Sequence, residues 1–281
     1  MHRNLAGRRL LITGASSGIG RSLAEQAAAR GARIILTARS ADKLADLERT
    51  LRERNADAQA VPADIIREED RTRLLEAVRD RFGGLDVLVN NAGIGSWGHF
   101  ADSSEEILRQ IMEVNFFAPA ELTRLAVPLL REGTQPAIVN VASMCGRRAM
   151  PAWSEYSASK HALCGLTEAL RGEMARFDID VLLVVPGLTR SDLPRHLLRS
   201  AGREKIDFAA GMPVDEVAAA ILRAIENNRT ESVLGSDARR MLLLNRFAPG
   251  LLDRLIRRRV RKLYEETVAR GQGPGAREKP V

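Results

Sequence analysis

The chain has 281 residues, of which 45% are hydrophobic and two are cysteines, and its formal net charge is +7 at pH 7. That length suits one large α/β domain or two small ones, and the two cysteines do not indicate a disulfide-stapled scaffold. No apolar stretch approaches the ~20 residues of a membrane-spanning helix, which excludes an integral helical membrane protein.

The positive charge is concentrated in one segment. From Asp237 to Tyr264 there are nine Lys/Arg and two Asp, a local balance of +7 that equals the charge of the whole chain. The rest of the chain is therefore neutral, so charge gives no argument for a nucleic-acid partner. Because no signal peptide or transit segment precedes the first predicted strand, we expect a cytoplasmic protein.

Short apolar runs alternate with amphipathic helical stretches along the chain. The predicted strands are Arg9–Thr13, Arg33–Ala38, Ala58–Pro62, Asp86–Asn90, Ala137–Ala142, Asp180–Val185 and Glu231–Leu234. The predicted helices are Gly18–Arg30, Ala41–Arg54, Glu68–Phe82, Ser104–Leu130, Ser154–Phe177 and Val214–Asn227. This alternation predicts an α/β fold: a single doubly wound (Rossmann) domain over residues 1–236, with a seven-stranded, mostly parallel sheet and helices on both faces.

The loop after the first predicted strand is rich in glycine. Thr13–Gly20 reads T-G-A-S-S-G-I-G, and glycines between a strand and a helix let a pyrophosphate approach the helix N-terminus. The loop residues expected to bind a dinucleotide are Gly14, Ser16, Ser17, Gly18, Ile19 and Gly20. The same letters also fit G-x-S-x-G, the nucleophile elbow of α/β hydrolases, with Ser16 as nucleophile. That alternative needs a downstream Asp and His, and none of the later histidines has an obvious position after a late strand.

The end of the second predicted strand bears on the choice of cofactor. An acidic residue there would bind the ribose 2′-hydroxyl of NAD, but the chain reads Leu36-Thr37-Ala38-Arg39-Ser40. An arginine can bind a 2′-phosphate through charged hydrogen bonds, so Arg39 predicts NADP(H). The alternative is an exposed arginine that opens the next helix.

Two polar side chains share one face of the predicted helix 154–177. Tyr156 and Lys160 are four residues apart, so both project from the same side, one turn from each other. A nearby cation favours the phenolate, so we expect Lys160 to lower the pKa of Tyr156 below about 10. Ser143 ends an apolar run upstream and can reach the same site. The pair alone also fits a solvated helix face.

These motifs occur in an order that resembles the short-chain dehydrogenases/reductases, over roughly residues 7–235. The motifs are T-G-A-S-S-G-I-G at Thr13–Gly20, Asp64, N-N-A-G at Asn90–Gly93, Asn115, Ser143, Tyr156-x-x-x-Lys160 and Pro186-Gly187. The resemblance implies a dinucleotide at the carboxyl ends of the strands, with no metal.

The resemblance also implies roles for individual cofactor-binding residues. Beyond the glycine loop and Arg39, the expected set is Asp64, Asn91, Ala92, Gly93, Tyr156, Lys160, Pro186, Gly187 and Thr189. Asp64 would lie near the adenine, and Thr189 and Ser191 compete for the nicotinamide carboxamide. Many NADPH-preferring members have a basic residue in the glycine loop where this chain has Ser17, so NADP(H) depends mainly on Arg39.

The implied reaction interconverts a carbonyl compound and an alcohol. Ser143 and Tyr156 would hydrogen-bond the carbonyl oxygen, and Tyr156 would deliver the proton as general acid. Lys160 would tune the phenol and bind the nicotinamide ribose, while Asn115 would help to anchor a proton-relaying water. The competing class is a non-catalytic NAD(P)-binding sensor or scaffold, which would not need the intact serine, tyrosine and lysine.

Residues 188–211 follow the sixth predicted strand and lack a strong sheet pattern, so we expect them to form a lid over the substrate. Apolar and basic residues alternate there, and Ile94, Met144, Met150 and Trp153 could add apolar walls. This composition indicates a lipophilic substrate, and the basic residues leave open that the substrate also carries an acidic group. An ordinary half-exposed helix is the alternative.

Residues 237–270 form a predicted basic, amphipathic helical extension, broken at Pro249-Gly250. Apolar residues with interspersed arginines are typical of a helix on an anionic membrane surface, which would place the protein peripherally on the inner face of a membrane. Packing against the protein's own body or a second subunit fits equally well. Residues 271–281 are predicted to be disordered. Small residues along helix 154–177 predict a homo-oligomer, a dimer or a tetramer.

Overall fold

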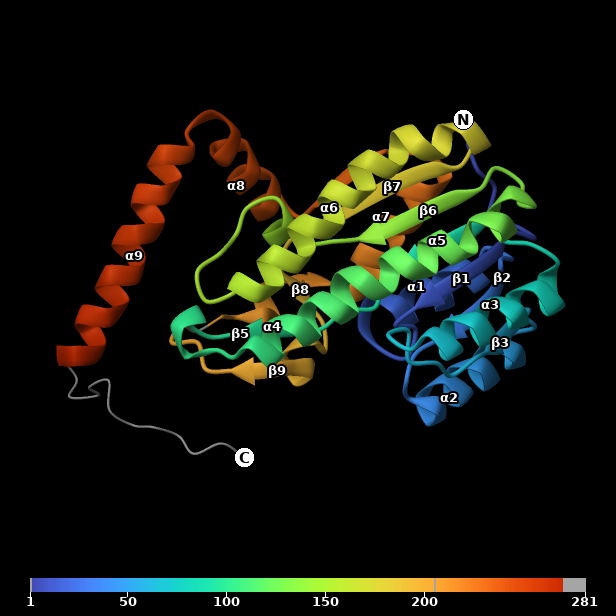
Figure 1. Ribbon diagram of the computed structural model, residues 1–281, viewed down its shortest axis with the longest axis horizontal. Helices are drawn as coiled ribbons and strands as arrows, with labels where there is room; N and C mark the ends of the chain where they lie inside the picture. The colour runs from blue at the N-terminus through green and yellow to red at the C-terminus, as the bar shows by residue number, and fades with distance from the viewer. Residues whose placement is uncertain (1, 205, 270–281) are drawn as a thin grey trace.

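The structure is a computed structural model that describes residues 2–204 and 206–269. At its centre is a seven-stranded sheet of order β11-β7-β6-β4-β1-β2-β3 in which every neighbouring pair is parallel (Figure 1). The strands are β1 (Arg9–Thr13), β2 (Arg33–Thr37), β3 (Ala58–Ala60), β4 (Val87–Asn90), β6 (Ala137–Val141), β7 (Asp180–Pro186) and β11 (Glu231–Leu234). The predicted doubly wound fold is confirmed.

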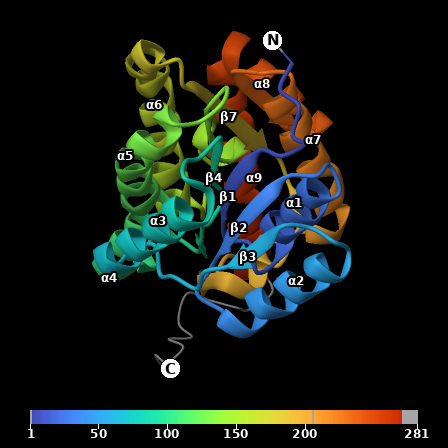
Figure 2. The same ribbon diagram turned by 90° about the vertical axis from the view of Figure 1, so that its right-hand side faces the viewer.

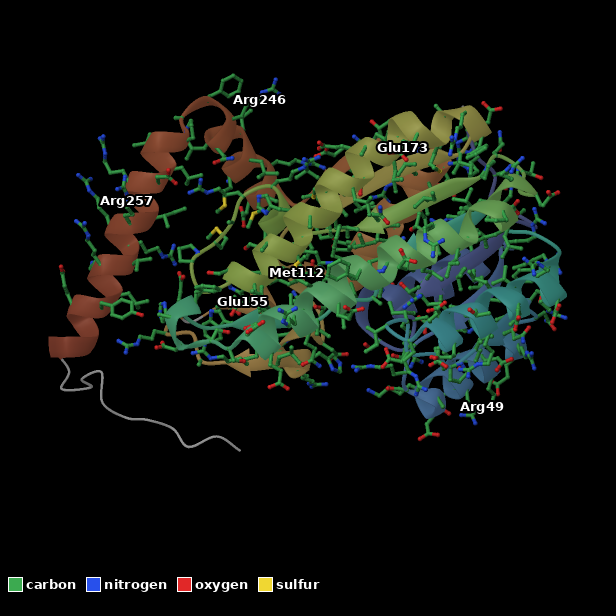
Figure 3. The ribbon with its side chains drawn as sticks, viewed as in Figure 1. Arg49, Met112, Glu155, Glu173, Arg246 and Arg257 are labelled. Carbon is green, nitrogen blue, oxygen red and sulfur yellow. The ribbon has the colours of Figure 1, made fainter. Side chains whose placement is uncertain are left out.

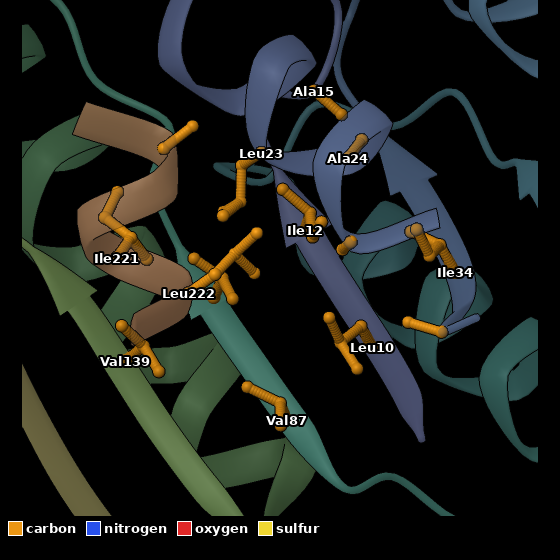
Figure 4. Packing of buried hydrophobic residues seen from close by; sticks show 14 of the residues in the cluster. Leu10, Ile12, Ala15, Leu23, Ala24, Ile34, Val87, Val139, Ile221 and Leu222 are labelled. Atoms are coloured by element: carbon orange, nitrogen blue, oxygen red, sulfur yellow. The ribbon is translucent and has the colours of Figure 1, made fainter. Parts of the chain in front are cut away.

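Helices cover both faces of this sheet, as Figure 2 shows. One layer contains α1 (Gly18–Ala28), α2 (Ala41–Glu53) and α7 (Val214–Glu226), and the other α3 (Glu68–Phe82), α5 (Ala118–Arg131) and α6 (Ser154–Met174). The side chains of successive strand residues point to opposite faces of the sheet, so Leu10 packs in the first core and Leu11 in the second. Figure 4 shows part of the first core, in which Leu222 of α7 and Leu23 of α1 lie beside the strand that carries Leu10 and Ile12. Strands buried on both faces explain the unbroken apolar runs of the sequence.

The predicted helix over 104–130 is present at residues 105–131, but it contains a π-helical turn that the sequence pattern did not predict. It divides into α4 (Glu105–Met112), a π-helical turn η2 (Glu113–Phe117) and α5. The wider turn contains Asn115, which is fully buried and hydrogen-bonds the backbone of Ile94 in both directions. We infer that these two hydrogen bonds stabilise the interruption of the α-helical pattern.

Residues 188–211 form short strands and turns and contain no α-helix among those described. Strand β8 (Thr189–Arg190) pairs with β10 (Met212–Pro213), and β9 (Leu197–Ser200) pairs with β5 (Gly95–Trp97). Short 3-10 turns, η5 (Leu193–His196) and η6 (Phe208–Ala210), lie between them. The alternative of a half-exposed helix is therefore wrong, because this segment is tied by backbone pairing to other parts of the chain.

The chain continues beyond the sheet as two helices, α8 (Ser236–Phe247) and α9 (Pro249–Ala269), broken just before Pro249 as predicted. Helix α9 stands at one side of the molecule, away from the sheet (Figure 1). No helix in the described ranges is both long and apolar enough to cross a membrane. The predicted disordered segment 271–281 lies outside the described residues.

Candidate active site

A cavity of about 630 Å3 opens at the carboxyl ends of the strands, where the strand order reverses between β1 and β4. The predicted site residues that line it are Gly14, Ser16, Ser17, Gly18, Ile19, Arg39, Asp64, Asn91, Ala92, Gly93, Ser143, Tyr156, Lys160, Pro186, Gly187 and Thr189. Gly20 and Asn115 do not line it but lie directly behind its wall, against Gly14 and Gly93. The glycine loop and the serine–tyrosine–lysine group therefore share one cavity.

The loop between β1 and α1 needs its glycines for close approach. A Cβ at Gly20 would lie only 2.2 Å from the carbonyl oxygen of Gly14, and Gly18 has a φ of +52°. Ser17 caps α1 without a side-chain hydrogen bond, and the first turn of the helix carries no acidic residue. The backbone N–H groups at the N-terminus of α1 are therefore free to bind an anion in the cavity.

A hydrogen-bond network holds the turn after β4 against this loop. The Thr13 hydroxyl donates to the Val89 carbonyl and accepts from the backbone N–H groups of Asn91 and Ala92. The Asn91 amide donates to the Thr13 carbonyl at 2.9 Å. These bonds set the position of the Asn91–Gly93 turn on the cavity wall.

The ends of β2 and β3 contribute the other polar groups of this half of the cavity. Arg39 is exposed and forms no ion pair with any described acidic side chain. Asp64 also lines the cavity and accepts a hydrogen bond from the Ile66 N–H. The Thr37 hydroxyl, also in the lining, is buried and has no hydrogen-bond partner among the described residues. An arginine and an unpaired hydroxyl fit a polar ligand that completes their hydrogen bonds.

Ser143, Tyr156 and Lys160 lie together on the next part of the wall. Ser143 follows β6, while Tyr156 and Lys160 come from successive turns of α6, as predicted. Burial raises the pKa of the Tyr156 phenol, the nearby Cys145 thiol raises it further, and hydrogen bonding with Ser143 opposes both effects. The phenol therefore keeps its proton at neutral pH.

Lys160 is only 4% exposed, and its Nζ donates to the Val141 carbonyl at 3.1 Å. Because burial disfavours its charge, the pKa of Lys160 falls to about 8. Its Nζ also lies 5.8 Å from the centroid of the Tyr156 ring. The expectation that the pKa of Tyr156 falls below about 10 is therefore not met in this structure, in which burial raises it.

Asn115 lies behind the wall that these residues form. Its Oδ1 accepts from the Ile94 N–H, and its Nδ2 donates to the Ile94 carbonyl and to Ser159 Oγ. A Cβ placed on Gly93 would lie 3.1 Å from Asn115 Oδ1 and 3.3 Å from Lys160 Nζ. Asn115 is thus a buried backbone-bonded residue that also lies close to the lysine.

Another part of the cavity carries several large apolar side chains. Its walls include Ile94, Met144, Met150, Trp153, Leu193 and Phe208. Trp153 meets the Tyr156 ring edge-on, with centroids 5.6 Å apart. None of the arginines in 188–211 lines the cavity; Arg199, for example, donates to the His99 carbonyl. These arginines therefore give no support to a substrate with an acidic group.

Several polar lining residues were not predicted from the sequence. They are Thr37, Ser40, Cys145, Asp192, His196, Glu204, Asp207 and Arg259. Arg259 belongs to α9 and forms an ion pair with Glu204. Thr37 and Ser40 lie at the end of the second predicted strand and Cys145 lies two residues after Ser143, so these three carried a positional signal. The others reach the cavity through tertiary contacts.

The hydrolase alternative finds no support in this geometry. Ser16 lines the cavity, but no hydrogen bond connects it to a histidine within the described residues. His99 contacts Tyr264, and His161 contacts the Ser157 carbonyl. A serine nucleophile needs a histidine base within hydrogen-bond reach.

Comparisons with known proteins agree with this arrangement. Residues 8–201 match the family model for short chain dehydrogenases. An uncharacterized oxidoreductase of Bacillus subtilis, YxnA, is 34% identical over 258 residues, which are 90% of this chain and 72% of the relative.

Solved structures match over most of their length. A short-chain dehydrogenase/reductase from Burkholderia phymatum in complex with NAD has a TM-score of 0.80 at 26% identity, covering 89% of this chain and 96% of the other. A short chain dehydrogenase from Burkholderia cenocepacia in complex with NADP has a TM-score of 0.76 at 26% identity, covering 90% and 99%. The chain belongs to the short-chain dehydrogenase/reductase family of oxidoreductases.

Proposed function

We propose that this protein is an NADP(H)-dependent oxidoreductase that interconverts a lipophilic carbonyl compound and its secondary alcohol, with Tyr156 as general acid/base. The observation that carries the proposal is the convergence of Ser143, Tyr156 and Lys160 on the cavity that the glycine loop opens into. A cavity that joins an anion-binding loop to a protonated phenol suits a dinucleotide and a carbonyl group together.

The chain's own residues fit the cofactor. The α1 N-terminus, with Ser16 and Ser17, would hold the pyrophosphate, and Asp64 would lie beside the adenine. When bound, NADPH supplies the hydride that reduces the carbonyl carbon. Similar solved structures contain NAD in one case and NADP in another, so the choice of NADP(H) depends on Arg39. Its unpaired guanidinium is suited to a 2′-phosphate.

The protein side of the reaction is the handling of one proton. The raised pKa of Tyr156 keeps the phenol protonated, as a donor to the carbonyl oxygen requires. Ser143 would hydrogen-bond the same oxygen as negative charge develops on it. Lys160 would return the proton to Tyr156, since its lowered pKa leaves it able to give up a proton near neutral pH. Asn115 would position the lysine side of this relay.

The test is NADPH oxidation, followed by near-UV absorbance, with a panel of ketones and aldehydes of increasing chain length. Tyr156→Phe should bind NADPH with unchanged affinity but lose about 10²- to 10⁴-fold in kcat, the usual contribution of a general acid. A matched control is Tyr264→Phe, on α9, outside the cavity lining. Near-normal turnover by Tyr156→Phe would contradict the assignment, and cofactor binding without turnover on any substrate would favour the sensor alternative.

We also propose a homo-oligomer that packs through α6. The face of α6 opposite the site exposes the small residues Ala158, Gly165, Ala169 and Gly172. A Cβ on Gly165 or Gly172 would meet nothing within 4 Å, so a second helix could approach closely there. Analytical sedimentation should give the mass of an oligomer for the wild type. It should give a lower mass for Gly165→Gln, because the longer side chain would hold the two helices apart.

A further inference from the structure

Helices α8 and α9 each present a pair of large apolar side chains to water. Leu243, Phe247, Leu251 and Leu255 are 60%, 75%, 47% and 46% exposed. They are half of the large hydrophobic side chains that are exposed in the described part of the chain. Each pair is spaced four residues apart, so each helix carries its pair on one face. A concentration of this kind marks an interaction surface.

Arginines flank these apolar side chains. Arg254, Arg258 and Arg261 are exposed and form no ion pair with a described acidic side chain. Figure 3 shows nitrogen-bearing side chains of α9, Arg257 among them, projecting away from the body. We call Leu243, Phe247, Leu251, Leu255, Arg254, Arg258 and Arg261 the outer face.

The inner side of the same helices is attached to the body. Asp253 pairs with Arg148, and Arg259 pairs with Glu204. Tyr264 contacts His99 and lies under the guanidinium of Arg203, 4.5 Å from the ring centroid. The apolar residue Leu252 is buried. Helix α9 is therefore held to the body by its inner side, and the outer face stays exposed although the helix is attached.

We propose that the outer face docks on an anionic phospholipid membrane. Apolar tips between unpaired arginines suit a helix pair that lies in the headgroup region. A symmetric dimer through this face would bring two arginine clusters together, which like charges oppose. A contact with a different part of a second copy is not favoured by net charge either. Segment 237–264 holds the whole excess of +7, so the rest of the chain has no net negative charge to attract these arginines. Since no described helix can span a bilayer, the contact is peripheral.

Docking would bring the cavity close to the membrane, because Arg259 lines the cavity from the inner side of α9. A lipophilic substrate dissolved in the bilayer would then reach the site without crossing water. This consequence rests on the proposed function, whereas the docking itself does not.

The experiment is flotation of the full-length protein with vesicles at an ionic strength of about 0.15 M. We expect binding to phosphatidylcholine–phosphatidylglycerol vesicles and none to pure phosphatidylcholine vesicles. The triple variant Arg254→Gln/Arg258→Gln/Arg261→Gln should partition about 100-fold more weakly, since each arginine near an anionic surface contributes roughly fivefold. NADPH turnover of a water-soluble carbonyl compound, measured in parallel, reports on the proposed function separately and should not change.

A matched control removes three exposed arginines from the other end of the molecule. Arg49→Gln/Arg67→Gln/Arg79→Gln has the same net charge as the test variant and should bind vesicles like the wild type. Equal loss in both variants, or no binding of wild type to the anionic vesicles, would overturn the proposal.

The second variant, Phe247→Ser/Leu251→Ser, separates a membrane from a second copy of the chain. We expect at least tenfold weaker binding to the anionic vesicles and an unchanged mass in sedimentation. A lower mass with unchanged vesicle binding would identify a protein interface on the outer face and would overturn the proposal.

Discussion

Replacement of Lys160 by methionine should stabilise the fold while abolishing turnover. Lys160 is buried, and its only described hydrogen-bond acceptor is the Val141 carbonyl. A methionine has a similar length and no charge to desolvate. The lysine is therefore a position where the proposed chemistry and the stability of the fold have opposite requirements.

The magnitude follows from the pKa of Lys160, which is about 8 in the folded protein against an ordinary value of 10.5. At about 1.4 kcal/mol per pKa unit, burial of the charged form costs about 3 kcal/mol. Loss of the bond to Val141 offsets about 1 kcal/mol of this, so Lys160→Met should gain about 2 kcal/mol at pH 7.

The sign of the pH dependence is fixed by the lowered pKa. Below pH 8 the side chain is charged in both the folded and the unfolded chain, so the full cost is present. Between pH 8 and 10.5 the unfolded chain binds more protons than the folded one, so wild-type stability rises with pH relative to the variant. Above 10.5 the cost is gone.

Urea unfolding of both proteins without cofactor, at equal protein concentration, measures this difference at pH 7 and again near pH 10. The advantage of Lys160→Met should shrink or reverse at the higher pH. Lys43→Met, at an exposed position, is the control and should change the free energy of unfolding by less than about 0.5 kcal/mol. A variant that is less stable than wild type at pH 7 would refute the reasoning.

Three further predictions concern pH, the glycine loop and the cofactor. Because the pKa of Tyr156 is raised and that of Lys160 is about 8, kcat/KM for carbonyl reduction should fall above pH 8, as a pH–rate profile would show; a constant rate up to pH 10 would contradict this. Gly20→Ala should lose NADPH binding and about 1–3 kcal/mol of stability, because its Cβ would lie 2.2 Å from a backbone oxygen, whereas Gly172→Ala, with open space around it, should bind NADPH like the wild type in calorimetric titration. Arg39→Ser should raise KM for NADPH about 10- to 100-fold and leave KM for NADH nearly unchanged, and equal effects on both cofactors would remove the 2′-phosphate assignment.

The sheet could be predicted from the sequence because its strands are buried on both faces. Runs such as Val181–Val185 are continuously apolar and are separated by helical patterns of the expected length. The helix over 104–130 was predicted without its π-helical turn, because the residues around Asn115 carry an ordinary helical pattern. The turn depends on hydrogen bonds to Ile94, a contact that local sequence does not encode.

The cofactor half of the cavity was predictable for a similar reason: its residues follow strands, and parallel strands end at one edge of the sheet. The substrate half was not. Strands β5 and β9 are 3 and 4 residues long and pair across about a hundred positions of sequence, so no period marks them. Arg259 reaches the cavity only because α9 packs back on the body, which neither its charge nor its helical pattern indicates.

The polar side chains of the site are held mainly by backbone atoms of the sheet and of the turns that follow it. Lys160 bonds the last residue of β6, Asn91 bonds the last residue of β1, and Asn115 bonds the turn after β4. Because parallel pairing aligns these strands, with Leu10 opposite Val87 and Asn90 opposite Asn140, the register also sets the distances between the side chains. A slip of one residue in β6 would move the Val141 carbonyl away from Lys160 and turn Ser143 to the other face. The apolar runs that specify the register therefore also specify the site, which is why a core substitution far from the cavity can alter its geometry.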